Sequence, residues 1–194
     1  VSYNLRGEVL LAQGKAEDAE TAFRNALAAD PQFADARYNL ARVPFRKGDY
    51  DEARKQLEAL LGATTDDAKE RPRAQLIRYQ IFLTLLREGR DAAAQKAMDE
   101  VKMMDDSPAL YYAQAAWEFS HKNPGKGNDW VASAKKIYSP ALNVVFADSF
   151  YDLGWLSSAP VSEAPASSAP FVAQSETQPG EVGSLIEPSP IPGV

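Results

Sequence analysis

The sequence repeats itself at a fixed step of 34 residues over its first 67 positions. Residues of the same type or character recur at this step in four pairs: Gly14 and Gly48, Ala19 and Ala53, Phe23 and Leu57, and Leu27 and Leu61. A fixed period between about 20 and 50 residues is typical of stacked supersecondary units that form a solenoid. The repeat therefore predicts a chain of similar units, each packed on its neighbours.

Each unit is predicted to be a pair of helices. In the first unit, residues 3–13 form one helix and residues 17–29 form the second. Gly14 ends the first helix, because a glycine just past a helix takes the left-handed conformation without a steric penalty. Pro31 follows the second helix, which it cannot continue because it lacks a backbone N–H.

Small residues are expected where the two helices of a unit cross. Gly7 and Ala19 allow close approach in unit one, and Phe23 fills the space between the helices. With these residues the unit resembles the tetratricopeptide repeat family, whose pattern is carried here by Tyr3, Gly7, Leu10, Gly14, Ala19, Phe23, Ala26 and Pro31. The resemblance implies an all-α helix–turn–helix solenoid, in which the first helix of each unit lines a concave groove.

The repeat becomes less regular after the second unit. The next turn glycine, Gly89, follows Gly48 by 41 residues, so we place an insertion of seven residues within 62–71. The predicted helical domain, 1–156, comprises units at about 1–33, 34–67, 72–106 and 108–138 and a helical cap at 140–156. Residues 157–194, rich in Pro, Ser, Ala and Glu, form a low-complexity tail that is extended or disordered by composition.

Two segments are predicted to interrupt helices. Pro44 lies inside the first helix of unit two, where its ring removes a hydrogen bond, so we expect a kink or a break. A bend there could also turn Phe45 and Arg46 toward the groove. Residues 123–127 contain one proline and two glycines and are expected to form a loop before a return helix at 129–138.

Charge and composition exclude several classes of function. The net charge is −6, and the tail contributes four glutamates and no basic residue. The rest of the chain is nearly neutral, with 21 basic and 23 acidic residues, which argues against broad nucleic-acid binding. The chain contains no run of 18 apolar residues, so the sequence predicts no membrane span. Because the chain starts at Val1, we expect a processed or trimmed product. The compartment stays open, with the bacterial cell envelope or periplasm favoured over the cytoplasm.

Catalysis, metals and cofactors are not expected. The chain has no cysteine, and its single histidine, His121, falls at a helix end, where it is expected to interact with the helix terminus. Gly125, Lys126 and Gly127 lack the spacing of a phosphate-binding loop. We therefore predict no catalytic residue and no metal site or cofactor.

The expected partner is a protein or peptide held in the groove. Aromatic and apolar side chains with a few polar ones suit a helix or an extended peptide. The predicted groove residues are Asn4, Glu8, Tyr38, Asn39, Arg42, Phe45, Arg46, Tyr79, Leu83 and Leu86. The alternative for Leu83 and Leu86 is that they belong to the core. Two apolar islands in the tail are candidate docking segments: Phe171 and Val172, and Leu185 and Ile186. They could pack on the chain's own groove or on a neighbouring subunit, or they could be incidental.

Two functions follow from this organisation. The first is a non-catalytic protein–protein interaction scaffold or adaptor, a subunit of a bacterial multiprotein assembly. The second is an accessory or regulatory domain trimmed from a larger enzyme or envelope protein. The sequence of the full-length polypeptide would separate the two.

Overall fold

The structure, a computed structural model, describes residues 2–65, 67, 69–102 and 107–157. Within these residues it contains nine α-helices and no β-strand. The helices are α1 (Ser2–Ala12), α2 (Ala16–Ala29), α3 (Ala34–Lys47), α4 (Tyr50–Gly62), α5 (Arg71–Arg87), α6 (Asp91–Lys102), α7 (Ala109–Ser120), α8 (Pro124–Ile137) and α9 (Pro140–Asp152). The predicted all-α solenoid is confirmed, and the predicted tail lies outside the described residues.

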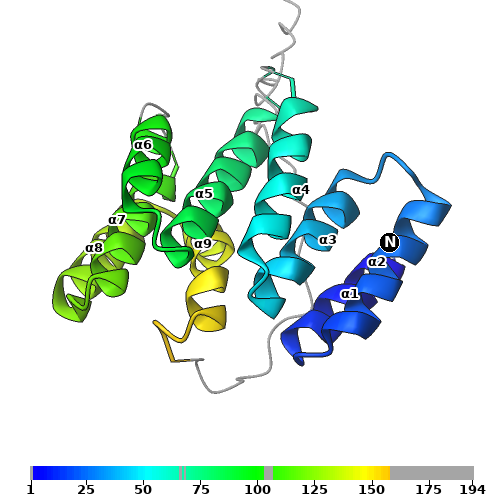
Figure 1. The fold of residues 1–194 in the computed structure, drawn as a ribbon, viewed down its shortest axis with the longest axis horizontal. Helices are drawn as coiled ribbons and strands as arrows, with labels where there is room; N and C mark the ends of the chain where they lie inside the picture. Colours follow the sequence, from blue (N-terminus) through cyan, green and yellow to red (C-terminus); the bar gives the residue numbers. More distant parts are fainter. Residues whose placement is uncertain (1, 66, 68, 103–106, 158–194) are drawn as a thin grey trace, which may run out of the picture.

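The first eight helices form four hairpins that stack side by side. Helices α1 and α2, α3 and α4, α5 and α6, and α7 and α8 pack in pairs, and the second helix of each pair packs on the first helix of the next. Figure 1 shows the hairpins following one another from the N-terminal pair in blue to α7–α8 in yellow-green. Each hairpin thus buries one apolar face inside its own pair and another against a neighbour.

The tight turns between paired helices use the residues that the sequence indicates. Gly14, Gly48 and Gly89 have φ of 76°, 80° and 69°. At these values a side chain would strain the backbone, so glycine is the favoured residue. In the fourth hairpin Lys122 takes the same left-handed conformation, with φ of 63°. The fourth turn therefore has the same left-handed geometry although its residue is lysine and not glycine.

The crossing of α1 and α2 is as close as the small residues predict. A Cβ atom built on Gly7 would lie 2.6 Å from Cδ1 of Phe23, well inside van der Waals contact. Phe23 and Ala19 are completely buried. The aromatic ring of α2 therefore fills the space that a side chain at position 7 would need.

The predicted break at Pro44 is wrong, because α3 continues through it to Lys47. The missing N–H of the proline removes one helical hydrogen bond, the one to the carbonyl of Leu40, and the helix ends three residues later. Phe45 is buried and packs edge-on against Tyr50 of α4, with ring centroids 5.3 Å apart.

The loop predicted at 123–127 is also wrong, because α8 begins at Pro124. Proline is favoured in the first turn of a helix, where its missing N–H has no partner to lose. Gly127 is needed inside the helix, since a Cβ there would lie 2.9 Å from the ring of Phe119 in α7. This glycine therefore permits a close helix crossing and does not form a loop.

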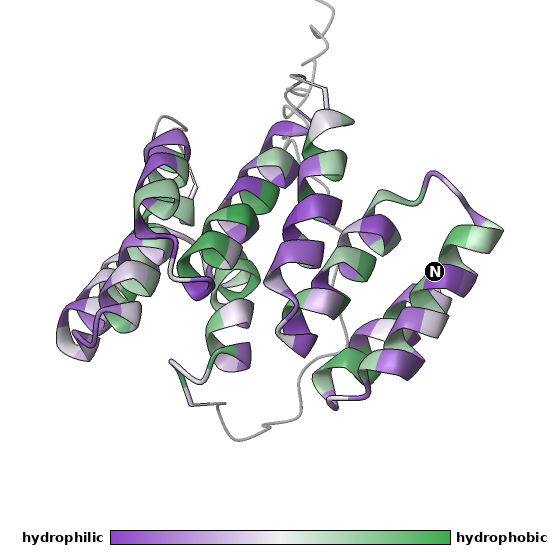
Figure 2. Ribbon diagram, in the orientation of Figure 1, coloured by the Kyte–Doolittle hydropathy of each residue, from purple (hydrophilic) through white to green (hydrophobic). Residues whose placement is uncertain are grey.

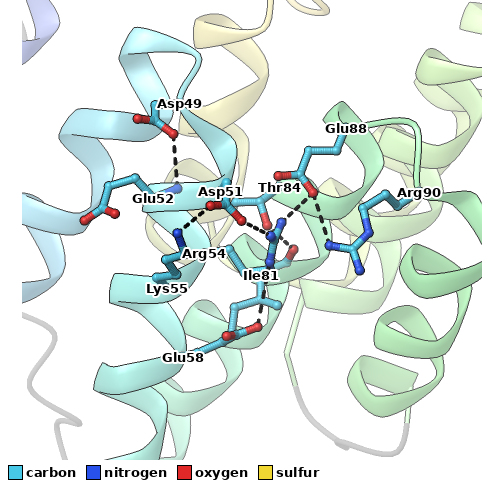
Figure 3. Close-up of polar contacts among 10 residues, drawn as sticks. All are labelled: Asp49, Asp51, Glu52, Arg54, Lys55, Glu58, Ile81, Thr84, Glu88 and Arg90. Carbon is cyan, nitrogen blue, oxygen red and sulfur yellow. Dashed lines mark hydrogen bonds and ion pairs between the residues drawn. The ribbon is translucent and has the colours of Figure 1, made fainter.

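A polar network joins the second and third hairpins on the surface of α4. Arg54 of α4 forms ion pairs with Asp51 and Glu58 of its own helix and with Glu88 at the end of α5. Glu88 also accepts from Arg90, as Figure 3 shows. The Arg54 side chain is only 11% exposed, so its charge is compensated by carboxylates and not by water alone. Figure 2 shows that much of α4 is hydrophilic, whereas the C-terminal turns of α5 beside it are apolar.

The close crossing of α1 and α2 predicts a destabilising substitution. Gly7→Ala should lower the free energy of unfolding by about 1–3 kcal/mol, because the added methyl group must displace Phe23. Urea unfolding followed by circular dichroism measures the change.

Gly62→Ala is the matched control, since nothing lies within 4 Å of a Cβ at that position in α4. It should be neutral or stabilising, because alanine favours the helix. Equal stability of the two variants would contradict the close crossing.

Candidate functional site

Helix α9 packs on one surface of the first helices of the second, third and fourth hairpins, and we call this surface the groove. Side chains of α3, α5 and α7 contact α9 directly, through the residues described below. Figure 1 shows α9, in yellow, between the α7–α8 hairpin and the α3–α4 hairpin. The predicted cap therefore covers the fourth hairpin, as expected, and continues across the third to the second.

The apolar part of this contact is aromatic. Tyr79 of α5 meets Phe146 of α9 edge-on at a centroid distance of 5.3 Å. Tyr112 of α7 stacks on Phe146 at 6.1 Å and meets Phe150 edge-on at 5.4 Å. Phe150 and both tyrosines are completely buried, and Phe119 of α7 closes the cluster against Phe150. Offset and edge-on aromatic pairs of this kind add to the free energy of burial.

Each buried tyrosine hydroxyl has a partner on α9. The Tyr79 hydroxyl donates to the backbone carbonyl of Phe146 at 3.1 Å, and the Tyr112 hydroxyl donates to Oδ1 of Asn143 at 3.1 Å. Gln80 of α5 donates to Oγ of Ser149 at 2.6 Å. Burial raises the pKa of Tyr79 well above its ordinary value and that of Tyr112 to about 12. These hydroxyls therefore act as neutral donors that fix the position of α9.

Two arginines of α3 pair with two aspartates of α9. Arg42 forms an ion pair with Asp148, and Arg46 forms one with Asp152 at 2.6 Å. The aspartates are four residues apart on α9, and the arginines are four residues apart on α3. Each pair therefore lies one helical turn from the other on both helices. The Asp152 side chain is only 7% exposed.

A chain of hydrogen bonds extends this polar contact to α1. Arg42 donates to Oδ1 of Asn39 at 3.5 Å, and Nδ2 of Asn39 donates to Oε1 of Glu8 at 2.9 Å and to Oδ1 of Asn4 at 3.1 Å. Asn4 donates in turn to Glu8 at 2.9 Å. Asn4 and Asn39 are buried, so the predicted polar groove residues of the first two hairpins satisfy one another.

The structure thus brings seven of the ten predicted groove residues into one contact region. Arg42, Arg46 and Tyr79 touch α9, and Asn4, Glu8 and Asn39 support Arg42 from behind. Tyr38 also lies near Asp148, and burial raises the pKa of its hydroxyl above its ordinary range. The remaining three are Phe45, Leu83 and Leu86, which are buried in the largest hydrophobic cluster. Leu83 and Leu86 therefore occupy core positions, which was the alternative considered for them from the sequence.

Sequence reasoning missed the occupant of the groove. The sequence predicts that residues 140–156, including Phe146 and Phe150, form a cap. It assigns no role to Asp148 and Asp152. The available signal was their spacing: the two phenylalanines and the two carboxylates each recur four positions apart, so each kind forms a row along the helix, and the offset of two positions puts the two rows on different sides of it. The tail residues Phe171, Val172, Leu185 and Ile186 lie outside the described residues.

His121 is where the sequence placed it, at the C-terminal end of α7. Its Nδ1 lies 2.7 Å from the carbonyl oxygen of Trp117, and its ring stacks on Trp117 at 4.2 Å. Its Nε2 lies 3.3 Å from Asp91. The hydrogen bond to Trp117 raises the pKa of the imidazole above its ordinary value. The expected interaction with a helix terminus is confirmed.

Two further features of the described residues bear on function. They contain no group of three or more His, Cys, Asp or Glu side chains that could hold a metal ion. None of their helices has the length and apolar character needed to cross a lipid bilayer.

Stacked helical hairpins, with a groove lined by their first helices, define a helical-repeat protein. The family model described as tetratricopeptide repeat matches residues 10–71 of the chain. Tetratricopeptide repeats generally mediate protein–protein interaction, and the family is generally non-enzymatic.

Comparison with solved structures adds a similarity of fold. A thermophilic tetratricopeptide-repeat protein of Thermus thermophilus is similar to the chain with 20% sequence identity and a TM-score of 0.38, over 77% of this chain and 97% of that chain. No curated protein matches the chain at a significant level.

The burial of Asp152 predicts a specific pH dependence of stability. Burial, and secondarily the nearby charge of Asp148, raises the pKa of Asp152 to about 6, against the opposing effect of Arg46 and Arg42. Between about pH 4 and pH 6 the folded state therefore binds more protons at this carboxyl than the unfolded state does. This group stabilises the fold at low pH, and its contribution is lost as the pH rises through 6.

We expect Asp152→Asn to gain stability relative to the native chain between pH 4 and pH 7, by an amount on the order of 1–3 kcal/mol. Urea unfolding at a series of pH values measures the difference. Asp148→Asn is the matched control, because removing the like charge should move the same dependence to lower pH. Parallel pH profiles for the native chain and Asp152→Asn would refute this assignment.

Proposed function

We propose that the chain is a non-catalytic protein–protein interaction scaffold, and that its concave groove binds an amphipathic helix of a partner subunit within a bacterial multiprotein assembly. The observation that supports this proposal is the seating of α9 across α3, α5 and α7. The contact between α9 and the groove has the chemistry of helix-in-groove recognition, with aromatic anchors packed on α5 and α7 and ion pairs to α3 on another side of the helix. In this structure the groove is occupied by helix α9 of the same chain.

Helix α9 indicates what a partner helix must present. Phe146 and Phe150 occupy the aromatic part of the groove, and Asp148 and Asp152 face the two arginines of α3. A partner with the same pattern carries aromatic residues four apart and carboxylates four apart, offset by two positions. The neutral tyrosine donors add a requirement for an accessible carbonyl or side-chain oxygen.

A partner helix competes with α9 for the groove. Only Tyr138 and Ser139 separate α8 from α9, so α9 is held close to the groove at an effective concentration on the order of millimolar or higher. A partner present at micromolar concentration must therefore bind the vacated groove about a thousandfold more tightly than α9 does to displace half of it. The groove consequently selects a closely matched helix over weakly similar ones.

A charge-reversal experiment tests this proposal on the full chain. The variant Asp148→Arg with Asp152→Arg places four like charges at the contact and should release α9. A fluorescent peptide spanning residues 138–157, with the native aspartates, should then bind this variant. Fluorescence anisotropy should give a dissociation constant at least tenfold lower for the variant than for the native chain, whose groove is occupied.

The control peptide carries the same two arginine substitutions and should not bind the variant. Circular dichroism of the variant verifies that the helical content of the scaffold is retained. If the native and charge-reversed peptides bind the variant equally, or if neither binds while the scaffold is folded, the groove does not recognise helices through these residues and the proposal is wrong.

A further inference from the structure

The four hairpins share one register, which allows equivalent positions of their first helices to be compared. The left-handed turn residues fix this register: Gly14, Gly48, Gly89 and Lys122. Counting forward from each turn by the same number of residues aligns the small residues at the helix crossings as well, namely Ala19, Ala53, Ala94 and Gly127 on the second helices. The alignment therefore holds on both helices of every hairpin.

Two positions in this register differ between the first hairpin and the others. Leu5 of α1 is equivalent to Asn39, Gln80 and Ala113, and Val9 is equivalent to Val43, Thr84 and Trp117. Leu5 and Val9 are 52% and 50% exposed, whereas Asn39 and Val43 are 5% and 1% exposed. Gln80 and Thr84 in the third hairpin are 3% and 0% exposed. The positions that are covered in the second and third hairpins are thus open in the first.

The preceding hairpin contributes to the covering of these positions in the second unit. Asn39 hydrogen-bonds to Asn4 and Glu8 of α1. Val43 packs in one cluster with residues of α1 and α2: Leu11, Ala19 and Phe23. Helix α5 packs in the same way on α4, and α7 packs on α6. A further hairpin is therefore the structure that the fold itself places against this face of a first helix.

We propose that the face of α1 formed by Leu5 and Val9 is a stacking face for a further helical hairpin of the same repeat type. Terminal units of a solenoid require a polar outer face, and two large apolar side chains one helical turn apart do not provide it. Because the hairpins are connected by short segments such as residues 30–33, a hairpin before α1 would arrive in the register that covers both positions.

The test is an extended chain in which a copy of residues 1–34 is placed directly before Val1, which preserves the repeat step. In this chain, Leu5→Gln and Val9→Thr at the original positions should each lower the Tm by about 5 °C or more, because both side chains become buried. In the chain without the extension, the same substitutions should change the Tm by less than about 2 °C, because both side chains are exposed.

Two controls accompany the measurement. The same substitutions in the added copy, whose α1 is then the exposed end, should have little effect, and so should Val144→Thr on the exposed side of α9. If Leu5→Gln and Val9→Thr are equally mild in both chains, the face does not stack on a hairpin. If the chain without the extension dimerises reversibly and Leu5→Gln abolishes the dimer, the face belongs to a second copy, and the proposal is overturned.

Discussion

The contact between α9 and the first helices of three hairpins is the interaction on which the described architecture depends. Without it, Tyr79 and Tyr112 would open to solvent together with the apolar surface around them, since Phe146 and Phe150 cover both rings. Hairpin stacking alone joins neighbours, so each hairpin contacts only the next. Helix α9 joins the second, third and fourth hairpins at once. In a solenoid held by stacking alone, the curvature is the sum of the small rotations between units. Because α9 contacts three hairpins, it restrains this curvature.

The polar part of the same contact contributes specificity more than stability. Bringing Arg46 and Asp152 together in a mostly buried site costs desolvation of both charges, and the raised pKa of Asp152 is the sign of that cost. The two arginine–aspartate pairs fix the position of α9 along the groove, because a shift of α9 by one turn would leave one arginine and one aspartate without partners. The aromatic cluster stabilises α9, and the ion pairs select its register along the groove.

The sequence predicted the repeating part of the fold well, because its determinants are local. Gly14, Gly48 and Gly89 mark turns wherever they occur, and Ala19 and Ala53 mark close helix crossings. The same logic identifies Gly127 as a crossing residue, equivalent to Ala19, yet the proline and glycine shortly before it suggested a loop. Position along the repeat was the better guide than local composition. The groove residues were placed on the correct helices, but the side chains that line an open groove and those that hold an internal helix are of the same types. Only the three-dimensional path of the chain after Ser139 distinguishes the two.

Nuclear Overhauser effects between aromatic rings test most directly whether α9 occupies the groove in solution. If it does, cross-peaks join the rings of Tyr79 and Phe146 and those of Tyr112 and Phe150, whose centroids are 5.3 Å and 5.4 Å apart. These residues are 67 and 38 positions apart in the sequence, so no local contact can produce the signals. If both cross-peaks are absent while those within the hairpins, such as Phe45 to Tyr50, are present, α9 does not lie in the groove and the account is contradicted.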